Sequence, residues 1–329
     1  MTAPGDWTAL PKVELHLHLE GAAPPAFIRT LAAEKHIDLS RLFTPDGAYR
    51  WSDFAGFLRT YEAACSVLAT PDDFRRLVAA VLQTSAAQGV IYAELFLAPD
   101  LCAAGDPAAW PDFLAAMGQG ADAVPAVEAR FIPVAIRHLG RDRAERAART
   151  VAATPHPRVT GFGLAGEERV GHPSDYARAF AAAAEAGLGL TAHAGEVAGP
   201  ESVAAVLDCL PVTRIGHGVR AIEDPALVRR LAAEEILLEV CPGSNLALGL
   251  YPDWPSHPVA RLRAAGVRVS LSTDDPPYFH TTLSAEYAAL AQAFGWTPAD
   301  LAALNRDALA GAFCDDATRA RLLARLERE

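Results

Sequence analysis

The sequence predicts an α/β fold, a (β/α)8 TIM barrel that forms one domain over residues 1–329. Eight short runs are rich in apolar residues, and Ala-rich helical stretches separate most of them. This alternation is typical of parallel strands that helices cover on both faces, and eight such units favour a closed barrel over an open sheet. Polar residues also follow many of the strands, at the end of the unit where barrel proteins place their functional sites.

The first strand is predicted from residues 14–21, Glu-Leu-His-Leu-His-Leu-Glu-Gly. Strict alternation places His16 and His18 on one face of the strand, and three leucines, at positions 15, 17 and 19, on the other. Two imidazoles in this arrangement can converge on one metal ion. The alternative is a half-buried strand whose histidines only form hydrogen bonds, because a short motif carries a real false-positive risk.

Extra helices are predicted between the first and second strands, over about residues 22–88, where we expect a lid on the C-terminal mouth of the barrel. A helix within residues 51–68 would have an apolar face made of Phe54, Phe57, Leu58, Tyr61 and Cys65. Thr70, followed by a proline and two aspartates, is typical of a helix N-cap, and Gly89 is expected to end that helix. The aromatic face is also compatible with ordinary core packing.

The other elements follow from the same alternation. Seven further strands are predicted over residues 90–97, 130–136, 159–164, 188–193, 214–217, 236–240 and 267–272. Helices are predicted over residues 175–186, 200–210, 224–234 and 257–265, with two more in the tail from residue 297 to residue 329. The charged run 137–149 is predicted to be the solvated face of a helix.

Composition excludes several classes of protein. Of the 329 residues, 51% are hydrophobic, and 40 acidic against 29 basic residues give a net charge of −11. This charge argues against a general nucleic-acid or anionic-membrane binder, but not against a small neutral base or nucleoside as ligand. The five scattered cysteines and the absence of a signal-like N-terminus or a long apolar run predict a cytoplasmic protein. The oligomeric state stays open.

Three histidines and one aspartate at the ends of predicted strands form a set of metal ligands. His16 and His18 lie on the first strand, His193 ends the fifth, and Asp274 follows the eighth. Imidazole suits zinc, and a carboxylate completes the shell while a position stays open for water. We therefore predict one Zn²⁺ per chain, which would lower the pKa of a bound water to about 7.

Three more residues near these strand ends have properties that catalysis needs. Glu196, three residues after His193, suits a general acid. His217, between two glycines, is placed to polarise or orient the water, and Gly166 would let a backbone N–H approach a ligand closely. Each residue has a structural alternative, as a turn residue or a first-turn acid. Those alternatives do not explain why all of these residues fall at the ends of predicted strands.

Together these residues resemble the adenosine/adenine deaminase family of the amidohydrolase superfamily. The matching segments occur in family order along nearly the whole chain, at residues 10–21, 193–196, 214–218, 239–242 and 272–276. The resemblance implies hydrolytic deamination at purine C6, with zinc held by His16, His18, His193 and Asp274.

The resemblance also implies a role for each residue at the mouth. Glu196 would protonate purine N1, and His217 would position the attacking hydroxide. Asp275 would hold N7, and the Gly166 N–H would meet N3. The implied substrate-binding set is His18, Glu20, Gly166 and Asp275.

Two positions bear on the substrate. Glu20 stands where many adenosine deaminases of this family have an aspartate that meets the ribose, and its longer carboxylate would reach a ribose hydroxyl or fill that space. Gly216 resembles the adenosine branch, because the adenine branch usually has aspartate there. With the aromatic helix, which resembles the family's lid, Gly216 favours adenosine and 2′-deoxyadenosine, converted to inosine and 2′-deoxyinosine in purine salvage. The alternatives are adenine, converted to hypoxanthine, and a larger adenine nucleoside such as aminodeoxyfutalosine.

Two other classes of protein fit this sequence less well. A two-metal barrel hydrolase of cyclic amides or phosphoesters often needs a bridging lysine after the fourth strand, where this chain has Gly163-Leu164-Ala165-Gly166. A catalytically inert purine-binding barrel predicts a missing ligand or acid, and no such position is missing here.

Overall fold

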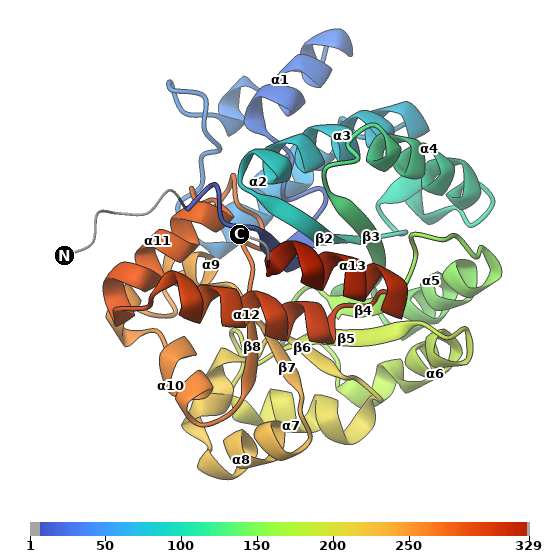
Figure 1. Ribbon diagram of the computed structural model, residues 1–329. Coiled ribbons are helices and arrows are strands. Elements are labelled where there is room, and N and C mark those ends of the chain that lie inside the picture. The colour runs from blue at the N-terminus through green and yellow to red at the C-terminus, as the bar shows by residue number, and fades with distance from the viewer. Residues whose placement is uncertain (1–6, 328–329) are drawn as a thin grey trace.

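The strands form one parallel ring, as the sequence predicts. The computed structural model describes residues 7–327, apart from the side chains at positions 54, 55, 103 and 104. The eight strands are hydrogen-bonded in chain order and lie at the centre of the molecule (Figure 1). They are β1 (Lys12–His18), β2 (Val90–Leu97), β3 (Glu128–Ile136), β4 (Gly161–Ala165), β5 (Gly189–Ala194), β6 (Arg214–His217), β7 (Leu237–Val240) and β8 (Arg268–Leu271). Two backbone hydrogen bonds close the ring, from His18 N to Asp274 O (3.0 Å) and from Asp274 N to His16 O (3.1 Å).

Helices surround the ring and bury its outer face. Those that follow β2 to β8 are α4 (Trp110–Asp122), α5 (Arg141–Ala153), α6 (Ala177–Glu185), α7 (Pro200–Cys209), α8 (Pro225–Ala233), α9 (Pro242–Ala247), α10 (Val259–Ala264) and α11 (Leu283–Phe294). The largest apolar cluster joins the strands to these helices, since nearly every strand residue is buried. The short interstrand helices are Ala-rich, so they pack closely on the strands.

The first strand departs from the strict alternation that the sequence predicts. Its pairing with β2 slips by one residue between Glu14 and Leu17, which is a β-bulge. The backbone N–H groups of Leu15 and His16 both donate to Ser272 Oγ, at 3.2 and 3.1 Å. Leu15 consequently packs in a different apolar cluster from Leu17, so the expectation that the three leucines share one face was wrong for Leu15.

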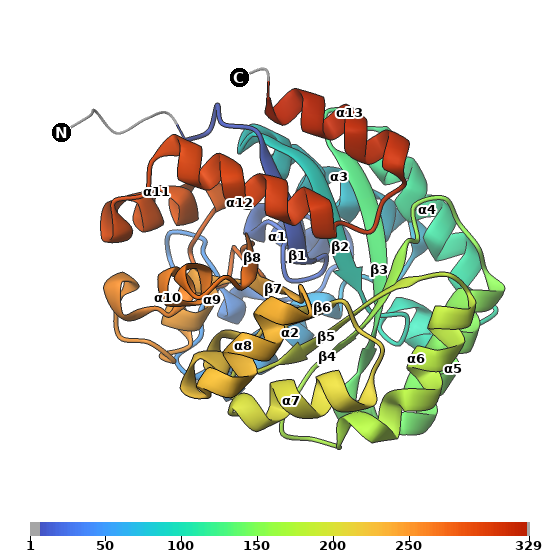
Figure 2. The same cartoon turned by 60° about the horizontal axis from the view of Figure 1, so that its bottom comes forward.

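Two C-terminal helices, α12 (Pro298–Gly311) and α13 (Asp316–Leu326), lie across one end of the barrel (Figure 2). The side chain of Asn305 accepts a hydrogen bond from Val13 N (2.8 Å), near the start of β1. The guanidinium of Arg214, the first residue of β6, donates to Gly311 O (3.1 Å). The helices therefore cover the N-terminal end of the strands, and the C-terminal mouth is left for the site.

The insertion between β1 and β2 contains α1 (Pro25–Glu34), α2 (Phe54–Cys65) and α3 (Pro71–Ala87). Thr70 forms the predicted N-cap as a reciprocal capping box with Asp73, and Gly89 follows the helix end with φ +77°. Trp51 Nε1 donates to Tyr278 O (2.8 Å), and the rings of Phe57 and Phe279 lie 5.2 Å apart. The insertion is thus attached to the chain that follows β8, although the predicted contribution of the Phe54 side chain lies outside the described residues.

Candidate functional site

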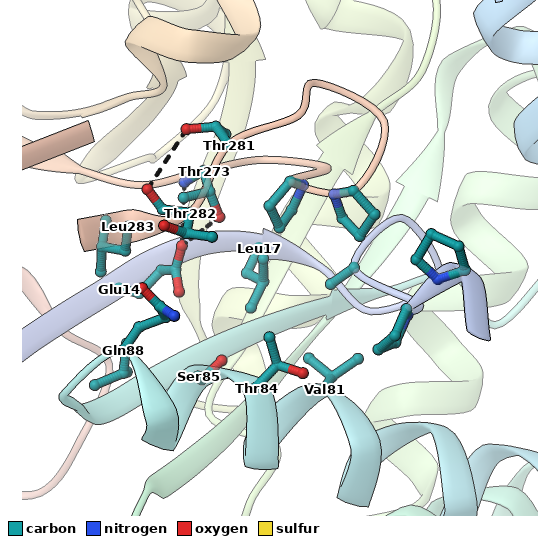
Figure 3. Close-up of a pocket in the computed structure, with 16 residues that line it drawn as sticks. Glu14, Leu17, Val81, Thr84, Ser85, Gln88, Thr273, Thr281, Thr282 and Leu283 are labelled. Atoms are coloured by element: carbon teal, nitrogen blue, oxygen red, sulfur yellow. Dashed lines mark hydrogen bonds between the residues drawn. The ribbon is translucent and has the colours of Figure 1, made fainter. Parts of the chain in front are cut away.

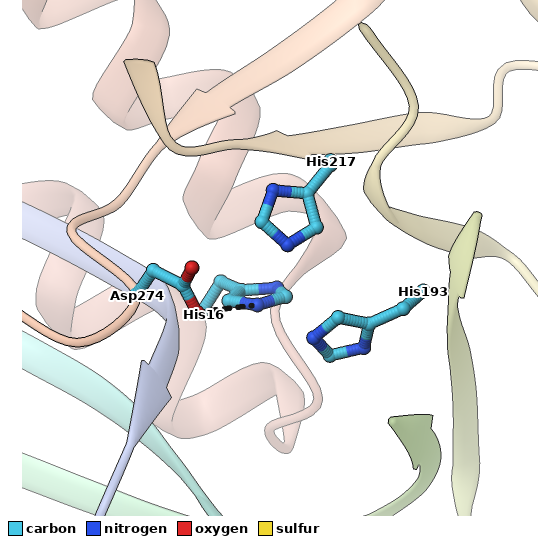
Figure 4. A group of neighbouring side chains, drawn as sticks. All are labelled: His16, His193, His217 and Asp274. Carbon is cyan, nitrogen blue, oxygen red and sulfur yellow. Dashed lines mark ion pairs between the residues drawn. The ribbon is translucent and has the colours of Figure 1, made fainter. Parts of the chain in front are cut away.

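Side chains from β1, β5, β6 and the segment after β8 meet at the mouth of the barrel (Figure 4). His18 Nε2 lies 3.2 Å from His193 Nε2 and 3.3 Å from Asp274 Oδ1, and His16 Nε2 lies 3.4 Å from Asp274 Oδ1. His217 joins them, because the ligand atoms of His16, His193, His217 and Asp274 lie within 4.8 Å of one another. The fold therefore brings together all four predicted metal ligands, although His16 and Asp274 are 258 positions apart in the chain.

The hydrogen bonds behind these ligands suit a cation. His16 Nδ1 donates to Glu239 Oε2 (2.8 Å) and His193 Nδ1 donates to Leu164 O (2.9 Å), so the Nε2 atom of each ring faces the centre. Within the described part of the chain, the buried Nε2 of His16 has no hydrogen-bond partner. Three imidazole nitrogens with one carboxylate oxygen form a donor set that fits zinc.

The carboxylate of Asp274 is also held from behind. Ser244, on α9, donates a hydrogen bond to Asp274 Oδ2 (2.8 Å), which leaves Oδ1 directed at the histidines. Asp274 and His217 have φ angles of 65° and 59°, in the left-handed region that few residues other than glycine adopt. Backbone strain of this kind concentrates at functional sites, where the surrounding structure maintains it.

A chain of hydrogen bonds fixes the tautomer of His217. Val259 N donates to His257 Nδ1 (3.3 Å), so the proton of a neutral His257 is on Nε2, which donates to Asn245 Oδ1 (3.1 Å). The amide nitrogen of Asn245 then faces His217 Nδ1 at 3.5 Å and donates to it. Burial lowers the pKa of His217 to about 4, so the ring is neutral and carries its proton on Nε2. His217 consequently presents a hydrogen-bond donor to the site, and not a metal-binding lone pair.

Glu196 follows β5 with its carboxyl next to His217. Its Oε2 lies 3.7 Å from His217 Nε2, and 15% of its side chain is exposed. Burial, reinforced by the charges of Asp274 and Glu168, raises the pKa of Glu196 well above its usual value. Burial therefore favours the protonated carboxyl, which is the form that a general acid requires.

Asp275 and Glu20 place two further carboxyls beside one another. Burial and then neighbouring acidic groups raise the pKa of Asp275 well above its usual value, and burial raises the pKa of Glu20 to about 7. In the described structure, Glu20 Oε1 and Asp275 Oδ1 are buried without hydrogen-bond partners. Asp275 packs directly on Gly21, where a Cβ would lie 1.5 Å from its Oδ1. Buried oxygens of this kind are available to a ligand.

Gly166 lies where the sequence predicts, at the mouth immediately after β4. It is exposed and has φ +92°, and a Cβ there would come within 3.0 Å of His138 Nδ1. Only glycine suits this backbone, so its N–H can approach a ligand without a side chain in the way.

Four supporting residues are absent from the predicted site: Arg137, Glu168, Glu239 and Ser244. Arg137 belongs to the charged run predicted to be solvated, yet it is buried and donates to His193 O (2.8 Å). That prediction was wrong for Arg137, because the short helix η3 (Arg137–Leu139) turns it inward before α5 begins. Glu239 and Ser244 could have been predicted as site residues, because they belong to motifs at the end of a strand. Glu168 has no sequence feature that distinguishes it from Glu167.

A cavity of about 210 Å³ lies apart from this cluster, between β1, α3 and the segment that leads into α11 (Figure 3). Glu14 and Thr273 line its polar part, and Leu17 lies on its apolar side. The side chain of Glu14 accepts hydrogen bonds from Thr273 N (3.1 Å) and Thr273 Oγ1 (2.6 Å). The four metal ligands do not line this cavity, so it is separate from the candidate site.

A parallel eight-stranded barrel with histidines and an aspartate that could hold a metal at its C-terminal mouth is the arrangement expected of a hydrolase of the amidohydrolase superfamily. Residues 11–329 match the model of the adenosine deaminase family. The chain therefore belongs to this family and is a hydrolytic deaminase.

Relatives match over almost their whole length. The chain is 50% identical to a protein of Agrobacterium fabrum named adenine deaminase, over 96% of this chain and 97% of that protein. It is 49% identical to an adenine deaminase of Chelativorans sp., over 96% of this chain and 98% of that protein. Among solved structures, the adenine deaminase of Arthrobacter aurescens has a TM-score of 0.85 at 31% identity, covering 97% of this chain and 98% of its own. A zinc-bound amidohydrolase of Burkholderia ambifaria has a TM-score of 0.88 at 29% identity, covering 99% of this chain and 92% of its own.

No described helix is both long and apolar enough to cross a membrane.

Proposed function

We propose that this protein is a zinc-dependent adenine deaminase, which converts adenine and water to hypoxanthine and ammonia. The observation that carries the proposal is the buried carboxyl of Glu20, whose Oε1 lacks a partner in the described structure. Relatives at 49–50% identity are named adenine deaminase, which supports the same substrate. The adenosine reading of the sequence is thereby less favoured than its adenine alternative.

The chemistry of the purine explains why Glu20 discriminates between the two substrates. Free adenine carries an N–H in its imidazole ring, which an unpartnered carboxyl oxygen can accept. In adenosine, N9 carries the ribose and offers no N–H. Because a buried polar group without a partner is costly, a site that pairs Glu20 with this N–H would reject a substrate that lacks it. The Glu20 carboxyl would also occupy space that a ribose needs.

For the metal, we propose one zinc ion held by His16, His18, His193 and Asp274. The orientation of the imidazole nitrogens and the zinc in the Burkholderia ambifaria relative support this set. When bound, zinc supplies a Lewis acid that lowers the pKa of water to about 7.

The remaining residues bind the purine and transfer protons. The protonated Glu196 donates to purine N1, which makes C6 more electrophilic, and His217 orients the attacking water through its Nε2–H. Asp275, whose burial among other acids raises its pKa and so favours the protonated carboxyl, donates to N7, and the Gly166 N–H meets N3. His18 borders the substrate as well as the metal. Water adds to C6 and gives up its two protons. One goes to the amino group, which leaves as ammonia, and the other returns to the Glu196 carboxylate, so hypoxanthine keeps the proton on N1.

We further propose that residues 22–88 act as a lid on a single barrel domain. The support is their attachment to Tyr278 and Phe279, three and four residues after Asp275. The charge of Glu20 adds to burial in raising the pKa of Tyr61, so Tyr61 of α2 lies near Glu20. For the location of the protein we propose the cytoplasm, which its five free cysteines support.

The second candidate substrate is adenosine, which Gly216 favours. A Cβ at Gly216 would lie 3.0 Å from His16 Cε1 and 3.2 Å from His193, so the two histidines would have to shift by a few tenths of an ångström to accept a side chain there. The aspartate of the adenine branch would therefore crowd two of the proposed metal ligands.

The substitution Glu20→Asp tests the proposal, because it keeps the charge but withdraws the carboxyl by one methylene. We expect kcat/KM for adenine to fall while that for adenosine rises, so that their ratio falls at least about tenfold, which corresponds to about 1.4 kcal/mol. Glu62→Asp, the same change at an exposed position of α2, is the control and should leave the ratio unchanged. An unchanged ratio in Glu20→Asp would show that Glu20 does not select the free base.

A further inference from the structure

One carboxylate outside the proposed catalytic set gathers an unusual number of hydrogen bonds. Glu168, in the loop after β4, is 6% exposed. Its side chain accepts from the backbone N–H of Glu196 (3.2 Å), Val197 (2.8 Å) and Ala198 (2.8 Å), and also from that of Gly195. The hydroxyl of Ser202 donates a fifth hydrogen bond (2.6 Å). Glu168 thus ties together the whole segment that carries Glu196.

The backbone of that segment is shaped to surround an anion. Gly195 has φ +68°, and a Cβ there would lie 2.4 Å from Val203 Cγ2, so the turn needs glycine. From Gly195 to Ala198, four consecutive N–H groups converge on one carboxylate, in the manner of the backbone nests that bind anions. In this protein the anion is the carboxylate of Glu168, supplied by the neighbouring βα loop.

We propose that Glu168 is a positioning residue, which aims the carboxyl of Glu196 by fixing the backbone of residues 195–198. The proposal rests on the proposed role of Glu196 as the acid. Glu168 acts through Glu196 and not on the purine, because its carboxylate already accepts hydrogen bonds from five donors. Burial would raise the pKa of Glu168, but the hydrogen bonds from Ala198 N and Ser202 outweigh it and keep the carboxylate ionised.

The substitution Glu168→Gln keeps the shape of the side chain and turns one acceptor oxygen into a donor. One end of the amide must then face N–H groups that it cannot accept from. The protein should still fold, since Arg220 Nη1 donates to Val197 O (3.0 Å) and keeps the segment attached. We expect kcat with adenine to fall at least about tenfold, while KM and the one-to-one zinc content change less than about threefold. A change confined to kcat is the pattern for an interaction made in the transition state.

A double-mutant cycle separates positioning from general structural damage. In a Glu196→Ala background, adding Glu168→Gln should lower the residual kcat less than twofold, because there is no carboxyl left to aim. A loss as large as in the wild-type background would overturn the proposal, as would a single variant Glu168→Gln whose kcat stays within twofold of wild type. Glu128→Gln, which removes a carboxylate paired with Arg130 and Arg321 at the start of β3, is the matched control and should leave kcat unchanged.

Two further measurements cover the remaining outcomes. If Glu168→Gln does not fold, Ser202→Ala removes one donor from the same carboxylate, and an unchanged kcat in that variant would overturn the proposal. If wild-type protein turns over adenosine and not adenine, the proposed substrate is wrong, and the same cycle measured with adenosine decides the role of Glu168. Wild-type protein inactive on both purines would overturn the proposed function together with this role.

Discussion

The substitution Glu239→Gln is expected to weaken zinc binding without contact with the ion. Glu239 is fully buried and accepts from His16 Nδ1 (2.8 Å), while its other oxygen accepts from Thr191 Oγ1 (2.8 Å) and lies 2.7 Å from Arg214 Nε. A neutral amide removes the charge that polarises the imidazole and cannot accept at both ends. Losing such a partner behind a metal ligand typically costs 10–100-fold in affinity, or about 1.4–2.8 kcal/mol. We expect this rise in the zinc dissociation constant, measured by competition with a chromophoric chelator.

Glu94→Gln is the matched control for this prediction. Glu94 is equally buried and pairs with the same guanidinium, that of Arg214, but its other contacts are Tyr92 Oη and Phe313 N and not a histidine. Both variants leave a buried arginine partly unpaired and should lose about 3 kcal/mol of unfolding free energy. Only Glu239→Gln should lose zinc affinity beyond about threefold. Equal affinities in the two variants would refute the argument that Glu239 acts through His16.

Two other predictions follow from buried carboxyls. Glu196→Ala should lower kcat with adenine by about 10²–10⁴-fold at unchanged zinc content, since it removes the acid; a loss within a fewfold, seen in an ultraviolet assay, would reject that role. Glu286 on α11 is buried, and burial raises its pKa from 4.5 to about 8. The unfolded chain loses this proton near pH 4.5 and the folded protein only near pH 8, so unfolding free energy should fall with rising pH across this window, by up to about 1.4 kcal/mol per unit. Glu286→Gln should resemble wild type at pH 5 and exceed its stability at pH 8.5 in urea denaturation; parallel curves would contradict this.

Most of the fold could be predicted from the sequence because the strands are short apolar runs between alanine-rich helices. All eight predicted strands are present, and the capping box at Thr70 forms as its residue types indicate. What the pattern did not contain was the bulge in β1. The bulge is stabilised by the hydroxyl of Ser272, which is 257 positions away from Leu15 in the chain. The alternation of residues within β1 therefore cannot predict the bulge.

The grouping of the four predicted metal ligands was predictable, since His16, His18, His193 and Asp274 all fall at strand ends that the barrel brings together. The residues that hold them were not. In the sequence, Arg137 belongs to a charged run that predicts a solvated helix face, and Glu168 has no feature that separates it from other loop acids. Their contacts with His193 O and with the backbone after β5 form only when the loops that follow β3 and β4 pack against that segment. The substrate was harder still, because it depends on whether one buried carboxyl faces an N–H or a ribose.

A direct comparison of substrates tests the central claim. Zinc-loaded wild-type protein would be assayed with adenine, adenosine and 2′-deoxyadenosine, following the loss of ultraviolet absorbance and identifying hypoxanthine or the inosines by chromatography. The account predicts that kcat/KM for adenine exceeds that for either nucleoside by about 10³-fold or more, because the Glu20 oxygen loses its partner and its space when a ribose is present. A nucleoside turned over as well as or better than adenine would contradict it.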